Sequence, residues 1–79
     1  MARVLLFGRL ADVAGWRERA LDCPSLSTLR TTLAAEDAAL GEALAGKGVQ
    51  VALDQVIVRG DAPLNAATEV AFLPPMSGG

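Results

Sequence analysis

The residues of this chain that could take part in chemistry stand at its end, in the stretch FLPPMSGG. Pro74 and Pro75 lack backbone N–H groups and favour an extended backbone, so they end a strand and direct the following residues away from it. Residues 76–79 could then span roughly 13 Å at about 3.3 Å per residue. Glycines present no side chain, so such a tail could enter a narrow channel with the carboxylate of Gly79 foremost. A carboxylate is a poor electrophile, but activation by a nucleotide would make it an acyl donor.

The rest of the chain offers little catalytic chemistry. Its 79 residues include no histidine, which removes the commonest general base and the commonest metal ligand. The one cysteine, Cys23, has no cation beside it in the sequence, and we interpret it as a structural thiol. A zinc site or a Cys-His nucleophile pair therefore cannot be built within a single chain. Any reaction has to use the chain end together with groups from other proteins.

Composition places the chain among small cytosolic domains. Hydrophobic residues make up 52% of it, which is enough for a core, and the length corresponds to one domain. The net charge is −2 and there is no basic stripe, so we expect no nucleic-acid partner. No apolar run approaches the ~20 residues that cross a bilayer, and the N-terminal apolar stretch is too short for a signal peptide. We expect a cytoplasmic protein with no membrane association.

Elements that could position the tail follow from hydrophobic periodicity. Alternating apolar residues predict strands at 3–7, 16–22, 49–54, 55–59 and 69–73. A helical turn is expected in RLADVAG, ending at Gly15, before the second strand. Ser25 is a suitable N-cap for a helix over 26–35, and Asp37 for a second helix that Gly46 would end in the left-handed conformation. This order predicts an α+β fold, with a mixed sheet of about four to five strands and helices packed on one face.

Strand alternation also predicts which residues face away from the helices. The charges of Arg3 and Glu69 mark one face of the first and last strands as outward, and the alternation puts Phe7, Ile57 and Leu73 on the same side. The inward face is predicted to carry four residues, Val56, Val58, Val70 and Phe72. Loops or the RLADVAG segment could cover the outward apolar residues. Alternatively, they form an exposed patch for a partner.

Three stretches, RVLLFGRLADVAG, VALDQVIV and EVAFLPPMSGG, resemble the molybdopterin synthase small subunits, the MoaD type of ubiquitin-like sulfur carriers with a β-grasp fold. The resemblance covers essentially the whole chain. Its most specific part is the last strand followed by PPMSGG, whereas residues 25–46 match in pattern only. The resemblance implies a β-grasp domain at 1–75 and a flexible Gly-Gly tail at 76–79.

The resemblance also implies a function and partners. An E1-like adenylyltransferase would use ATP and magnesium to adenylate Gly79, and sulfur from a sulfurtransferase would replace AMP to give a thiocarboxylate. That group would donate sulfur to cyclic pyranopterin monophosphate and form the dithiolene of molybdopterin, in molybdenum cofactor biosynthesis. The catalytic pocket would belong to the large subunit of a heterotetramer. This chain would then have no activity alone, no metal and no bound cofactor.

Site residues carried over from the resemblance form two groups. Tail insertion is assigned to four residues, Met76, Ser77, Gly78 and Gly79. Docking on the large subunit is assigned to five, Phe7, Ile57, Leu73, Pro74 and Pro75. Leu73 stands where the family often has an aromatic residue, which keeps the patch apolar but removes a ring for stacking.

Other functions stay open from sequence. A Gly-Gly end also occurs in sulfur carriers for thiamine thiazole synthesis, which usually lack the paired prolines, and in carriers for cysteine synthesis or tungsten cofactors. A β-grasp interaction module whose tail is simply disordered is the alternative of another class. The missing catalytic groups disfavour a stand-alone enzyme.

Overall fold

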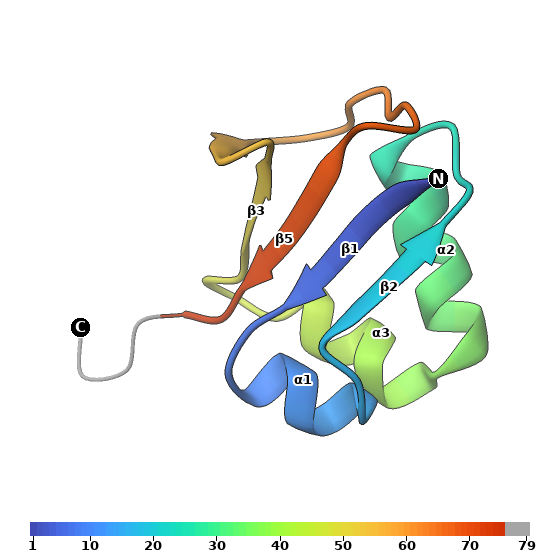
Figure 1. Ribbon diagram of the computed structural model, residues 1–79. Helices are drawn as coiled ribbons and strands as arrows, with labels where there is room; N and C mark the ends of the chain where they lie inside the picture. Colours follow the sequence, from blue (N-terminus) through green and yellow to red (C-terminus); the bar gives the residue numbers. More distant parts are fainter. Residues whose placement is uncertain (76–79) are drawn as a thin grey trace.

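The computed structural model describes residues 1–75 and places a mixed sheet against helices (Figure 1). The strands are β1 (Ala2–Leu6), β2 (Glu18–Leu21), β3 (Gln50–Leu53), β4 (Val56–Val58) and β5 (Glu69–Leu73). The helices are α1 (Arg9–Ala14), α2 (Leu26–Glu36) and α3 (Ala38–Leu44). The strand order is β2-β1-β5-β3-β4, with β1 and β5 parallel and the other neighbours antiparallel. The predicted α+β class with a mixed sheet is confirmed.

The core lies between the sheet and one helical layer. The two central strands, β1 and β5, bury Val4, Leu6, Val70 and Phe72, of which Phe72 is fully inaccessible to solvent. Leucines of α2 and α3 complete the cluster: Leu26, Leu29, Leu33, Leu40 and Leu44. Both helices lie on the same side of the sheet, so the other side has no helical cover (Figure 1). None of the helices within residues 1–75 is long and apolar enough to cross a membrane.

Local signals in the sequence set most helix ends. The Ser25 hydroxyl accepts a hydrogen bond from the N–H of Thr28 at 3.2 Å, and the Asp37 carboxylate accepts one from the N–H of Leu40 at 3.2 Å. Both predicted N-caps are therefore confirmed. Gly15 ends α1 in the left-handed conformation, as expected, with φ 82°.

The predicted end of α3 is wrong. The helix is followed by Ala45 in the right-handed region, and the left-handed residue is Gly48, with φ 87°, and not Gly46. The N–H of Gly46 still bonds to the carbonyl of Ala43 at 3.1 Å, so the chain continues a tightened helical turn at that point. The reversal toward β3 comes two residues later.

A two-residue turn, Asp54-Gln55, joins β3 and β4. Both residues have positive φ, 48° and 71°, as a type I′ hairpin turn requires. The turn pairs Leu53 with Val56, which places Val56 on the helix-facing side of the sheet, as predicted. However, Val56 is 63% exposed, because β4 is an edge strand with a neighbour on one side only. The predicted inward direction of Val56 is therefore confirmed, although the side chain is not buried.

Gln55→Gly should stabilise the domain by about 1 kcal/mol, because glycine adopts positive φ without the steric cost that other residues incur there. The measurement is the midpoint of urea unfolding. Gln50→Gly is the matched control: Gln50 is also exposed but lies in β3, where glycine should destabilise. A loss of stability in Gln55→Gly would contradict the assigned turn.

Candidate functional site

The candidate site lies where β5 leaves the sheet. Leu73 ends the strand and is half-buried, Pro74 is also half-buried, and Pro75 is exposed. The N–H of Phe7 donates to the carbonyl of Phe72 at 3.3 Å and prolongs the pairing of β1 with β5 up to this point. The residues assigned to tail insertion, Met76, Ser77, Gly78 and Gly79, lie outside the described residues.

An apolar row crosses four strands on the face that the helices leave uncovered. The register pairs Leu5 with Ala71, Ala71 with Ala52, and Ala52 with Ile57. Directly paired residues point to the same side of a sheet, so these four side chains form one line. Phe7 and Leu73 share the alternation of Leu5 and Ala71 and lie toward the end of β5. We call these six residues the apolar band: Leu5, Phe7, Ala52, Ile57, Ala71 and Leu73.

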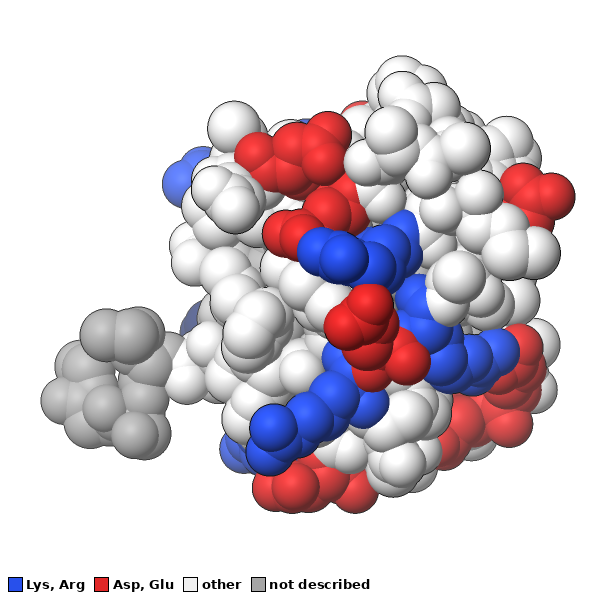
Figure 2. Space-filling model, in the orientation of Figure 1, with Lys and Arg blue, Asp and Glu red and all other residues white. Residues whose placement is uncertain are grey.

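Solvent reaches the two largest outer members of the apolar band. Phe7 and Ile57 are each 45% exposed, as the alternation predicted. The alternative that loops or residues 9–15 cover them does not hold for these two side chains. Figure 2 shows uncharged surface over the end of β5 near the tail, whereas charged side chains gather over β1, β2 and the start of β5. The structure thus places Phe7, Leu73 and Pro74 at one end of this face, whereas Ile57 lies at the level of Ala71, midway along β5.

Two further residues belong to this site, although the sequence marks them only as turn glycines. Gly8, with φ 56°, precedes α1, and a Cβ atom at this position would lie 3.1 Å from Cγ of Pro74. Gly48 lies between α3 and β3, and a Cβ atom there would lie 2.8 Å from Cβ of Pro75. Both prolines therefore approach backbone that has no side chain. In the sequence, only the fact that these residues are glycines could have pointed to them. Their contacts with the prolines join distant parts of the chain and cannot be read from the sequence.

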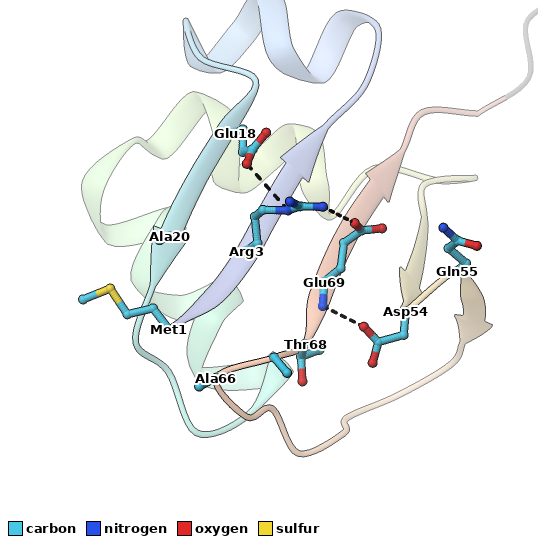
Figure 3. Close-up of a pocket in the computed structure, with 10 residues that line it drawn as sticks. Met1, Arg3, Glu18, Ala20, Asp54, Gln55, Ala66, Thr68 and Glu69 are labelled. Carbon is cyan, nitrogen blue, oxygen red and sulfur yellow. Dashed lines mark hydrogen bonds and ion pairs between the residues drawn. The ribbon is translucent and has the colours of Figure 1, made fainter.

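The largest hollow of the described residues is at the opposite end of the sheet (Figure 3). There the Arg3 guanidinium lies between the carboxylates of Glu18 and Glu69. The hydrogen bond with Glu69 raises the pKa of Arg3, and the negative charge of Glu18 adds to this effect. Asp54 accepts a hydrogen bond from the N–H of Glu69 at 2.9 Å and so ties the hairpin turn to the start of β5. Arg3 thus has two carboxylate partners and the Asp54 carboxylate has a backbone partner, so we interpret the hollow as structural.

Neither metal nor thiol chemistry has a visible site in the described part of the chain. Residues 1–75 contain no group of three His, Cys, Asp or Glu side chains that could hold a metal ion. Cys23 is buried, with its sulfur 3.9 Å from the hydroxyl of Thr32. A reactive thiol needs access to its substrate, so this position fits a structural role.

The β2-β1-β5-β3-β4 sheet with helices on one face defines a β-grasp, ubiquitin-like protein. The same fold occurs in the crystal structure of small archaeal modifier protein 1 from Haloferax volcanii, with a TM-score of 0.85 and 25% identity, over 99% of this chain and 98% of that one. It also occurs in the solution structure of small archaeal modifier protein 1 from Methanosarcina acetivorans, with a TM-score of 0.86 and 21% identity, over 99% of this chain and 95% of that one.

The chain belongs to the ThiS family, whose pattern it matches over residues 4–79. It is also 36% identical to the molybdopterin synthase sulfur carrier subunit of Escherichia coli strain K12, over the full length of both proteins. The resemblance inferred from RVLLFGRLADVAG, VALDQVIV and EVAFLPPMSGG is therefore confirmed.

Proposed function

We propose that this protein is the sulfur carrier subunit of a molybdopterin synthase, with Gly79 as the reactive residue. Three observations support the proposal: membership of the ThiS family, full-length similarity to a molybdopterin synthase sulfur carrier subunit, and the FLPPMSGG end. The observation that carries most weight is geometric. The apolar band crosses the uncovered face of the sheet and includes Phe7 and Leu73 at the end from which Pro74 and Pro75 lead to the Gly-Gly end.

The proposed chemistry begins with activation of the chain end. A carboxylate oxygen of Gly79 attacks the α-phosphorus of ATP in an E1-like adenylyltransferase, which holds magnesium, and pyrophosphate leaves. A sulfurtransferase supplies sulfur at the oxidation level of sulfide, which attacks the carbonyl carbon and displaces AMP. The product is a Gly79 thiocarboxylate, which is nucleophilic at neutral pH in the way that thiolates are.

Transfer then takes place in the pocket of the large subunit. The thiocarboxylate sulfur forms a bond to a carbon of cyclic pyranopterin monophosphate, and the carbon–oxygen bond that it replaces breaks, so that the oxygen leaves with a proton from the large subunit. Water hydrolyses the remaining bond between Gly79 and sulfur, and the carboxylate is regenerated. Acid and base groups would come from the large subunit, which agrees with the lack of histidine in this chain.

Docking would use the apolar band. None of its six residues is charged. The paired residues Ala52 and Ala71 have small side chains that are only 6% and 8% exposed, so nothing protrudes from the middle of the apolar band. A partner surface could therefore approach the sheet closely between Phe7 and Ile57. Depletion of charge at the centre and burial of aromatic residues are typical of stable interfaces.

The direct test is the intact mass of the chain after incubation with an E1-like adenylyltransferase, ATP, magnesium and a sulfurtransferase. A carrier should gain the mass difference between sulfur and oxygen, whereas an interaction module should stay unchanged. The thiocarboxylate form is then offered to large subunits and to thiazole-forming, cysteine-forming and tungsten-cofactor enzymes. Sulfur transfer to cyclic pyranopterin monophosphate, and not to these others, is the expected result.

Deleting Gly79 should abolish sulfur transfer without changing stability. The new terminal carboxylate would fall about 3.3 Å short, and a misplacement of 1 Å can already lower a rate by ~100-fold. Thiocarboxylate formation is followed by mass spectrometry and unfolding by urea titration. A deletion variant that still transferred sulfur at the normal rate would contradict the role of Gly79.

Phe7→Asp and Ile57→Asp should weaken binding of the large subunit by about tenfold or more, because each puts a charge into an apolar interface. Their folding should change little, since both side chains are exposed. Val56→Asp is the matched control, because Val56 is even more exposed but lies outside the apolar band. Binding is measured by titration calorimetry and folding by circular dichroism. Equal loss of affinity in all three variants would show that the apolar band is not the docking surface.

A further inference from the structure

We propose that Gly8 and Gly48 are positioning residues, which seat Pro74 and Pro75 and so set the direction in which residues 76–79 leave the domain. This inference rests on the proposed function, because direction matters only if the chain end has to reach a partner's pocket. It adds two residues that are far from Gly79 in the sequence to those on which delivery of Gly79 would depend. We call the four residues Gly8, Gly48, Pro74 and Pro75 the proline seat.

Pro74 and Pro75 approach Gly8 and Gly48 so closely that a side chain at either glycine would collide with a proline ring. A Cβ atom at Gly48 would lie 2.8 Å from Cβ and 3.7 Å from Cα of Pro75, so any other residue would push the proline away. A Cβ atom at Gly8 would lie 3.1 Å from Cγ of Pro74, which requires a shift of a few tenths of an ångström. Proline rings cannot rotate away as a flexible side chain does, because the ring fixes φ. Displacement would therefore pass into the backbone.

The proline seat joins three parts of the fold at the exit of the tail. Gly8 follows β1, Gly48 precedes β3, and the prolines continue β5, which lies between these strands in the sheet (Figure 1). Pro75 also borders a small hollow beside the first turn of α1 and the end of α3, lined among others by Arg9, Leu10 and Ala43. The direction of the chain after Leu73 is thus determined by contacts on two sides. The restricted φ of the prolines would carry this direction onward.

Positive φ is not the only reason why Gly8 and Gly48 have to be glycine. Four glycines of the described residues have positive φ: Gly8, Gly15, Gly48 and Gly60. At Gly15 and Gly60 an added Cβ atom would meet nothing within 4 Å, so those two positions need glycine for the backbone only. This difference gives a set of variants that all place alanine at positive φ, of which only two touch the prolines, and Gly48→Ala is the variant of that pair to compare with Gly15→Ala and Gly60→Ala.

The experiment compares Gly8→Ala and Gly48→Ala with Gly15→Ala and Gly60→Ala. All four should lose stability in urea unfolding, because alanine is strained at positive φ, and Gly8→Ala should lose most, because its ψ of −134° lies outside the left-handed region of Gly15. In NMR spectra, the nuclear Overhauser contacts from the α-protons of residues 8 and 48 to the rings of Pro74 and Pro75 should weaken only in the first pair. Affinity for the large subunit should fall by roughly tenfold in the first pair, since ordering a freed residue opposes binding by about 1–2 kcal/mol. It should fall less than about twofold in the second pair, whose substitutions leave the contacts of Pro74 and Pro75 unchanged.

A double-mutant comparison separates the seat from general damage. Gly48→Ala should weaken binding much less when Pro75 is already glycine, because the ring that it would displace is gone, and this non-additivity is the mark of a direct contact. If Gly48→Ala does not fold, Gly8→Ala is combined with Pro74→Gly in the same way, because Gly8 contacts Pro74. Equal affinity losses in both pairs, or additive effects at residues 48 and 75, would overturn the proposal. Failure of the wild-type chain to gain sulfur would contradict the proposed function instead, and the NMR contacts would still report on the seat.

Discussion

Parallel pairing of the first strand with the last is the constraint on which the rest of the structure depends. The register runs from Arg3 beside Glu69 to Leu6 beside Phe72, in the middle of the sheet. Because the strands are parallel and in this register, their apolar residues of even number all enter the core together. For the same reason the chain leaves β5 next to the point where it leaves β1. The close approach of Pro74 to Gly8 is a direct consequence.

The inward and outward sides of the two central strands could be predicted from sequence, because a charged residue marks one face of each strand. Charges on one face and large apolar residues on the other identify the inward side of β5, and Val70 and Phe72 are indeed fully buried. Val56 shows the limit of this reasoning, since alternation predicts a face but not the depth of burial. An edge strand can hold an apolar residue on the correct face and still leave it in water. The edge position itself depends on the whole sheet order.

Helix caps were predictable for another reason: the contacts of Ser25 and Asp37 are local. The end of α3 was not, because Gly46 and Gly48 are both candidates for a left-handed turn residue in the sequence AGKGV. The choice depends on where the chain has to join β3, and also on room for Pro75, which comes from the far end of the sequence. The chemistry of the chain end could be proposed from sequence because it is covalent. The proline seat could not, because it exists only once β1, β3 and β5 lie side by side.

The fold separates stability from recognition in space. Stabilising burial lies on the helix-facing side of the sheet, and the paired charges of Arg3, Glu18 and Glu69 lie at the end opposite to the tail. The apolar band and the proline seat occupy the remaining face and end. A carrier that visits more than one enzyme needs such a division, since each partner can contact the band without disturbing the core. Only the prolines belong to both regions: they follow a central strand of the core, and in the proposed proline seat they set the direction in which the chain continues toward Gly79.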